Sequence, residues 1–188
     1  MRRPILLLLS LALLLGLGGC MPYVRQTPEE ETTLITVGFS QVGAALEAGA
    51  AAHADWTIAA QLNGDFTQAK AYEETLAYLQ SNPAPDVVYC ENDNMCFGVM
   101  QALDELSIAY DDGGVTLISF DAGRTALSYC KDGKIDLCAE CNPLHGPRVR
   151  ALIEQLARGE TPEKLSYMPE ALFTADTLTA ELLESRVY

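Results

Sequence analysis

Cationic residues are scarce in this sequence. Its 188 residues include 12 Lys and Arg but 26 Asp and Glu, which gives a net charge of −14 at pH 7. A surface with this much negative charge is repelled by the phosphates of nucleic acids and by the headgroups of anionic membranes. Neither is therefore expected as a partner. We interpret the acidity mainly as a contribution to solubility.

Recognisable catalytic and metal-binding motifs are also missing. The sequence has no Ser/His/Asp order, nucleophile elbow or paired-carboxylate motif, so we expect that the protein is not an enzyme. Cys138-x-x-Cys141, with His145 nearby, has the residue types of a zinc or redox site. However, no second cysteine pair accompanies it, and no helix is predicted directly after Cys141. The sequence therefore predicts no metal, no thioredoxin-like chemistry and no cofactor.

Long hydrophobic runs are confined to the N-terminus. Two arginines precede the mainly apolar residues 5–17, and small residues precede Cys20. This layout is typical of an export signal, and the run is too short to span a bilayer comfortably as an ordinary transmembrane anchor. The residues around Cys20 resemble the lipobox of bacterial lipoproteins, in which the cysteine is acylated and becomes the new N-terminus.

We therefore predict that residues 1–19 are a signal peptide and that Cys20 is lipidated. Residues 20–33, which are rich in proline and glutamate, are predicted to form a polar tether. Removal of the two arginines would change the net charge from −14 to −16. The mature protein would be extracytoplasmic and would contact the membrane only through its lipid anchor.

The rest of the chain predicts an α/β fold. About 170 residues remain after the signal peptide, enough for one domain with a good core. Strand-length apolar runs alternate with segments of helical periodicity, which indicates a mainly parallel sheet with helices on both faces. The predicted strands are 34–40, 57–62, 86–90, 115–120 and 136–140. The predicted helices are 67–80, 94–106, 124–131 and 147–157. The core face of the last helix is predicted to consist of Val149, Leu152, Ile153 and Leu156.

The stretch 86–106 illustrates how a site could be built. A short apolar strand ends at the polar residues 91–94, and a helical pattern follows at once. Ligands of open α/β sheets lie beyond the carboxyl ends of the strands, so Asn92 is a candidate ligand residue. Asp93 or Asn94 is equally suited to capping the helix, a role that Asp and Asn often fill.

Polar residues follow the other predicted strands as well. With those after the third strand, they are Ser40, Gln41, Asn63, Asp65, Glu91, Asn92, Asp93, Asp121, Glu140 and Asn142. Parallel neighbouring strands would bring them to one edge of the sheet, which we call the rim. Its carboxylates and amides, with Phe66 and Phe120 beside them, fit a neutral polyhydroxylated ligand, because sugar hydroxyls both donate and accept hydrogen bonds. A phosphate would require a glycine-rich loop or cations. Ordinary caps and turns account for part of the set.

Several segments together resemble one protein family. They are GDFTQAK at 64–70, ENDNMCFGVMQAL at 91–103, ISFDAG at 118–123, YCKDGKIDLCAECNPLHGP at 129–147 and GETPEKL at 159–165. These segments resemble the distal lobe of ribose-, galactose- and galactofuranose-type periplasmic binding proteins, which capture sugars for ABC importers. ITVGFSQVG at 35–43 looks like the first strand of the other lobe of the same family.

The resemblance implies a binding site. By position, Asn92 resembles the amide that bonds sugar hydroxyls, and Asp121 resembles the carboxylate that chelates two of them. Glu140 stands where the family often has glutamine, and Gln41 is a weaker match to an amide of the opposite lobe. By position, Asp65 lies beside the family's rim. The implied ligand is a monosaccharide, and the implied partner is the permease of an ABC importer.

The length of the chain departs from the family. The family folds as two lobes of similar architecture, and residues 34–188 have room for one. We therefore interpret 34–43 as a remnant of the N-terminal lobe and 44–188 as mostly the C-terminal lobe, after an internal deletion, gene degradation or a gene-calling artefact. The strand in 34–43 is expected to add to an edge of the sheet or to pack loosely.

The resemblance thus predicts a sugar-binding lipoprotein of an ABC importer, or a remnant of one. The alternatives are an extracytoplasmic domain that presents sugar to a membrane receptor, or a truncated product that does not bind.

The cysteines give a separate prediction. With Cys20 lipidated, five cysteines remain, so at least one must stay free or pair with another chain. Because an exported chain meets an oxidising compartment, we expect one disulfide among Cys130, Cys138 and Cys141.

Overall fold

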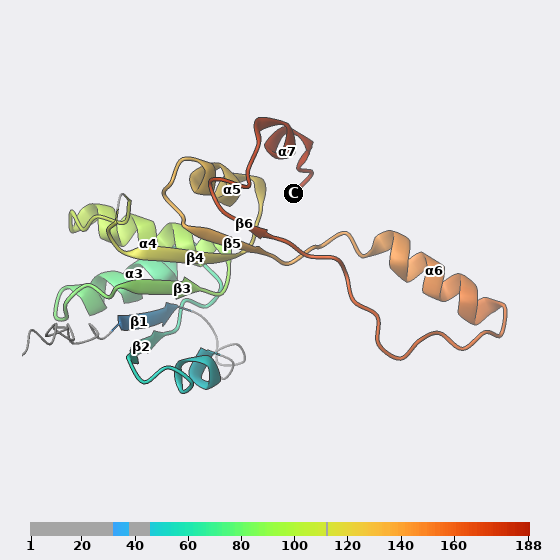
Figure 1. Ribbon diagram of the computed structural model, residues 1–188, viewed down its shortest axis with the longest axis horizontal. Coiled ribbons are helices and arrows are strands. Elements are labelled where there is room, and N and C mark those ends of the chain that lie inside the picture. The colour runs from blue at the N-terminus through green and yellow to red at the C-terminus, as the bar shows by residue number, and fades with distance from the viewer. Residues whose placement is uncertain (1–31, 38–45, 112) are drawn as a thin grey trace, which may run out of the picture. The chain divides into compact units, whose positions relative to one another are not determined.

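The architecture is taken from a computed structural model, which describes residues 32–37, 46–111 and 113–188, the first of these ranges by its backbone only (Figure 1). The predicted signal peptide, the predicted lipidation site Cys20 and most of the predicted tether lie outside the described residues. Within the described ranges, no helix is both long enough and apolar enough to cross a membrane.

The described residues form one six-stranded sheet with flanking helices. The strands are β1 (Thr32–Val37), β2 (Trp56–Leu62), β3 (Val87–Cys90), β4 (Thr116–Asp121), β5 (Leu137–Glu140) and β6 (Leu172–Phe173). The helices are α3 (Gln68–Leu79), α4 (Asp93–Glu105), α5 (Arg124–Lys131), α6 (Gly146–Ala157) and α7 (Ala180–Ser185). These elements confirm the predicted α/β class, and the predicted strands and helices from residue 57 to residue 157 are each found to within a few residues.

The order of the strands is β2-β1-β3-β4-β5-β6. The first five run parallel, and β6 pairs antiparallel with β5. Five parallel strands in the order 2-1-3-4-5 make a common doubly wound sheet. β1 lies inside this sheet, paired with β2 on one side and β3 on the other. The expectation that this strand would add to a sheet edge or pack loosely was therefore wrong.

One face of the sheet carries the main core. Helices α3, α4 and α5 pack with the strands in a single hydrophobic cluster, in which Val88 of β3 and Leu117 of β4 are fully buried. The alternate residues on the other face of these strands, such as Tyr89 and Phe120, are only half-buried, and their rings lie 5.1 Å apart. This follows from the period of two along a strand, because successive side chains point to opposite faces.

Helix α6 differs from its predicted role. Figure 1 shows it at the end of two extended segments, apart from the sheet, and none of its residues is buried. On its predicted core face, Val149, Ile153 and Leu156 are 49%, 60% and 61% exposed, and Leu152 is half-buried. The amphipathic pattern correctly predicted a helix, but the prediction of a core face was wrong because the described residues provide no surface that covers it.

Candidate functional site

The carboxyl ends of β2, β3, β4 and β5 meet at one edge of the sheet, as the sequence predicted for the rim. Here the backbone departs from ordinary conformations. Asp65 and Phe66 after β2 have φ angles of 47° and 53°, and Asp121 and Ala122 at the end of β4 have φ angles of 95° and 57°. Residues other than glycine rarely adopt positive φ, and such strained positions cluster at functional sites. Four rim residues therefore have left-handed backbone conformations, which fix the turns that follow β2 and β4.

Asn92 lies where β3 ends, and it caps helix α4. Its Oδ1 accepts a hydrogen bond from the backbone N–H of Met95 at 2.8 Å. Its amide nitrogen donates to the carbonyl oxygen of Phe66 at 3.4 Å, which joins the ends of β2 and β3. The cap is thus Asn92 rather than the predicted Asp93 or Asn94. Asn92 is half-buried, so it combines the capping role with a place at the rim.

Asp93, which the sequence analysis placed at the rim and considered as a cap, is a buried support of the rim. Its carboxylate accepts hydrogen bonds from the Ser119 hydroxyl at 2.6 Å and from the backbone N–H of Gly123 at 2.8 Å. Burial raises the pKa of Asp93 from 3.8 to about 6, although both hydrogen bonds act in the opposite direction. The carboxyl group thereby fixes the turn between β4 and α5, which carries Asp121.

Asp121 ends β4 and is exposed at the rim. Its carboxylate accepts a hydrogen bond from the backbone N–H of Asp93, and partial desolvation raises its pKa above the ordinary value. Its carbonyl oxygen accepts from the backbone N–H of Cys141 at 3.4 Å, which links the ends of β4 and β5. Asp121 therefore presents a fixed carboxylate to solvent, as a sugar site would need.

Glu140 ends β5, but its carboxylate is already engaged within the domain. It pairs with the Arg186 guanidinium at 2.8 Å, and its side chain is 8% exposed. It also accepts hydrogen bonds from the backbone N–H of Ala171 at 3.0 Å and from the Tyr188 hydroxyl. A ligand role for Glu140 would require it to share or exchange these partners.

Arg186 was missed by the sequence analysis. Besides its pair with Glu140, it donates to the carbonyl oxygen of Ala122 at 3.0 and 3.2 Å, and its guanidinium lies 4.2 Å from the centre of the Tyr188 ring. These contacts bind the C-terminal segment to the rim. A single arginine near the end of a chain carries no sequence pattern that could have indicated this role.

A hollow of about 180 Å³ lies beside Glu140. It is lined by Glu140, Asn142, Leu144, Leu182, Ser185, Arg186, Val187 and Tyr188. The hollow places Asn142 and Glu140, both predicted rim residues, on a concave surface.

The remaining predicted residues are Asp65 and Gln41. Asp65 is exposed at the rim, and its backbone N–H donates to Asn63 Oδ1 at 3.0 Å. Gln41 lies outside the described residues. The structure thus brings Asp65, Asn92, Asp121 and Glu140 to one edge of the sheet.

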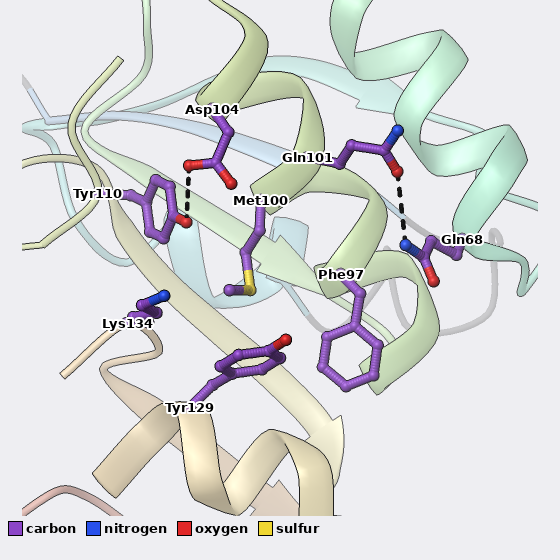
Figure 2. A pocket seen from close by; sticks show the side chains of 8 residues that line it. All are labelled: Gln68, Phe97, Met100, Gln101, Asp104, Tyr110, Tyr129 and Lys134. Carbon is purple, nitrogen blue, oxygen red and sulfur yellow. Dashed lines mark hydrogen bonds between the residues drawn. The ribbon is translucent and has the colours of Figure 1, made fainter. Parts of the chain in front are cut away.

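Figure 2 shows a second hollow, of about 230 Å³, formed largely by one side of α4 together with Tyr129 of α5. The Tyr110 hydroxyl donates to the Asp104 carboxylate at 2.9 Å, and Gln68 donates to Gln101 at 3.4 Å. None of the predicted rim residues lines this hollow, so it is distinct from the candidate site.

Comparison with known proteins decides the family. A family model described as "Periplasmic binding protein domain" matches residues 28–145, more than half of the chain. The chain belongs to this family. The members are substrate-binding proteins rather than enzymes, and the family implies an extracytoplasmic location.

Relatives of this periplasmic binding protein include sugar-binding proteins. The galactofuranose-binding protein YtfQ of Escherichia coli is 30% identical over 124 residues, which are 64% of this chain and 39% of YtfQ. The fructose import binding protein FruE of Bifidobacterium longum is 28% identical over 102 residues, 54% of this chain and 30% of FruE. This periplasmic binding protein therefore spans less than half the length of these two relatives.

Solved structures show the same fold. A protein from Mycobacterium smegmatis in complex with β-D-fucofuranose has a TM-score of 0.70 and 25% identity, over 77% of this chain and 50% of that protein. The arabinose-transporter binding protein of Shewanella, bound to L-arabinofuranose, has a TM-score of 0.73 at 21% identity, over 85% of this chain and 59% of that protein. These neighbours confirm that the described domain has the type I periplasmic-binding-protein architecture.

Proposed function

We propose that this periplasmic binding protein binds a neutral monosaccharide at the rim, as the substrate-binding component of an ABC importer or as a remnant of one. The observation that carries this proposal is the convergence of the Asn92 amide and the Asp121 carboxylate on one strained edge of the sheet. The names of the relatives support it, since they describe binding of galactofuranose, fructose and related sugars.

The chemistry of the rim favours a sugar over a charged ligand. A carboxylate accepts from two adjacent hydroxyls, and an amide both donates and accepts. Arg186, a cation at this edge, is already paired with Glu140. A phosphate or a carboxylate ligand would therefore meet mainly negative charge, whereas a neutral polyol would not.

Two further parts of the proposal extend beyond the domain. Lipidation of Cys20 would hold the protein at the membrane, where a permease could receive the sugar. The alternative is that the same domain presents sugar to a membrane receptor. Genes for a permease and an ATPase beside this gene would favour transport, and a sensor kinase gene would favour the receptor.

We expect the chain as given to bind sugar weakly. In the family the sugar is enclosed by two lobes, and the described residues offer the rim of one sheet. Loss of three or four hydrogen bonds, each worth about 0.5–1.5 kcal/mol, would weaken a micromolar dissociation constant to about millimolar. Calorimetric titration of the purified chain with ribose, galactose and arabinose measures this directly. A dissociation constant at or below the micromolar range would contradict the predicted loss of a lobe, and no binding at any concentration would contradict sugar binding itself.

The two roles of Asn92 can be separated by substitution. Asn92→Ser keeps an oxygen that can cap α4 but removes the amide donor, so we expect stability close to wild type and weaker sugar binding. Asn92→Ala removes both the capping oxygen and the amide donor. Loss of the cap should cost about 1 kcal/mol of unfolding free energy. Asp121→Asn should keep the positive φ angle, which asparagine tolerates, and lose most of the binding. Urea unfolding and calorimetric titration of the three variants test this, and unchanged binding in Asn92→Ser and Asp121→Asn would remove both residues from the site.

A further inference from the structure

Four of the five cysteines in the described chain are completely buried. Cys90 ends β3, Cys96 lies in α4, Cys130 lies in α5 and Cys138 lies in β5, and each has 0% exposure. Cys141, just beyond β5, is exposed. All five carry free thiols in this structure. Their burial is therefore unequal, with four on the helix-covered side of the sheet and one at the surface.

The four buried thiols form two pairs. Cys96 hydrogen-bonds with Cys90, which joins the first turn of α4 to the strand before it. Cys130 hydrogen-bonds with Cys138, which joins α5 to the next strand. The Cys130 thiol also donates to the carbonyl oxygen of Phe173 at 3.6 Å, so its direction is fixed. Two thiols held within hydrogen-bonding reach are close to the separation that a disulfide requires.

The arrangement does not favour a metal. Among the residues that the structure describes, no group of three or more His, Cys, Asp or Glu side chains is arranged to hold a metal ion. A structural zinc site takes four ligands in a tetrahedron. A hydrogen bond between the two thiols of each pair is instead the pattern of disulfide partners.

We propose that Cys90–Cys96 and Cys130–Cys138 are two intradomain disulfides of the exported protein, and that Cys141 remains a single exposed thiol. The family implies an extracytoplasmic location, where disulfides form and persist. The pairing is consistent with the odd number of cysteines, because it leaves one cysteine without a partner. It also specifies the disulfide expected among Cys130, Cys138 and Cys141.

The oxidant would be a disulfide-bearing oxidoreductase or a small-molecule disulfide. One cysteine thiolate of a pair attacks the oxidant's disulfide, which gives a mixed disulfide and releases one oxidant thiol. The second thiolate then attacks the mixed disulfide, which forms the protein disulfide and releases the second oxidant thiol. The two electrons lost by the pair reduce the oxidant, and the two protons end on its thiols.

Because the buried sulfurs cannot meet an oxidant in the folded domain, the reaction belongs to the folding stage. Once formed, the first disulfide would hold the start of α4 to β3 directly below the rim. The second would hold the C-terminal end of α5 to the start of β5. Both cross-links would constrain elements that place candidate ligand residues.

The test is thiol counting by mass spectrometry. The chain is exported in a bacterial host, denatured, and alkylated without reductant, and its peptides are mapped. We expect Cys141 alone to be alkylated among the five cysteines, and peptides linked as Cys90–Cys96 and Cys130–Cys138. Alkylation of all five, or a disulfide that contains Cys141, would overturn the proposal.

Variants distinguish specific pairing from general oxidation. Cys96→Ser should add one alkylated thiol, at Cys90, and Cys138→Ser should add one at Cys130. Cys141→Ser is the matched control, and it should keep both disulfides and show no alkylated thiol among the remaining four. Scrambled pairing in that control would count against the proposal, even if the other variants fold poorly.

Discussion

Replacing Gly98 with alanine is expected to destabilise the domain by about 3 kcal/mol or more, or to prevent folding. Gly98 lies in α4 where this helix crosses α3. A Cβ atom at this position would lie 2.3 Å from the backbone carbonyl oxygen of Gln68 and 2.8 Å from the backbone nitrogen of Tyr72. Both are backbone atoms, so the clash can be relieved only if the two helices move apart. The higher helix propensity of alanine, about 1 kcal/mol, is too small to compensate.

A glycine in open surroundings provides the control. Gly49 lies in the short helical segment at residues 46–50, and a Cβ atom there would meet nothing within 4 Å. Gly49→Ala should therefore leave stability unchanged or raise it slightly. Urea unfolding followed by circular dichroism measures both variants. Equal midpoints for the two would show that the contact between α3 and α4 is looser than the structure indicates.

The second large effect concerns pH. Because the pKa of Asp93 is raised from 3.8 to about 6 in the folded protein, the folded state binds this proton more tightly than the unfolded state does. The stability contributed by Asp93 is therefore fully present below about pH 4 and is lost as the pH rises through about 6. A pKa shift of this size corresponds to roughly 3 kcal/mol of unfolding free energy between low and high pH.

Asp93→Asn isolates this contribution. Asparagine resembles the protonated aspartic acid in shape and has no charge, so the variant should be close to wild type near pH 4. Between pH 5 and pH 7 the wild type should lose stability relative to the variant. Urea unfolding at several pH values gives the difference in unfolding free energy between the two proteins. Asp132→Asn, at an exposed turn, is the control for the loss of one carboxylate. If the unfolding free energies of wild type and Asp93→Asn changed with pH in the same way, the raised pKa of Asp93 would be contradicted.

The sequence predicted the repeating units of the fold well. The short apolar run before residue 91 and the helical periodicity after it correspond to β3 and α4. Such local patterns arise from burial of one helix face or one strand, which the sequence records directly. The place of β1 was not predictable in this way, because a parallel strand can pair with any neighbour and periodicity does not specify which.

The candidate site was predicted only in part. Parallel strands bring their carboxyl ends to the same edge of the sheet. The sequence could therefore predict that Asn92 and Asp121 lie together at the rim. That Asn92 caps α4 while Asp93 supports the next turn depends on backbone geometry that neighbouring Asn and Asp residues do not reveal. The engagement of Glu140 by Arg186 joins residues far apart in the chain, and neither lies in a motif that indicates the other.

Helix α6 has a consequence for how the protein unfolds. Because none of its residues is buried, the helix lies outside the cooperative unit formed by the sheet and helices α3, α4 and α5. A helix of 12 residues without packing is marginal in water, so it should open and close independently of that unit. Local opening would then begin in α6. Amide hydrogen exchange should report a lower free energy of opening for α6 than for the core strands.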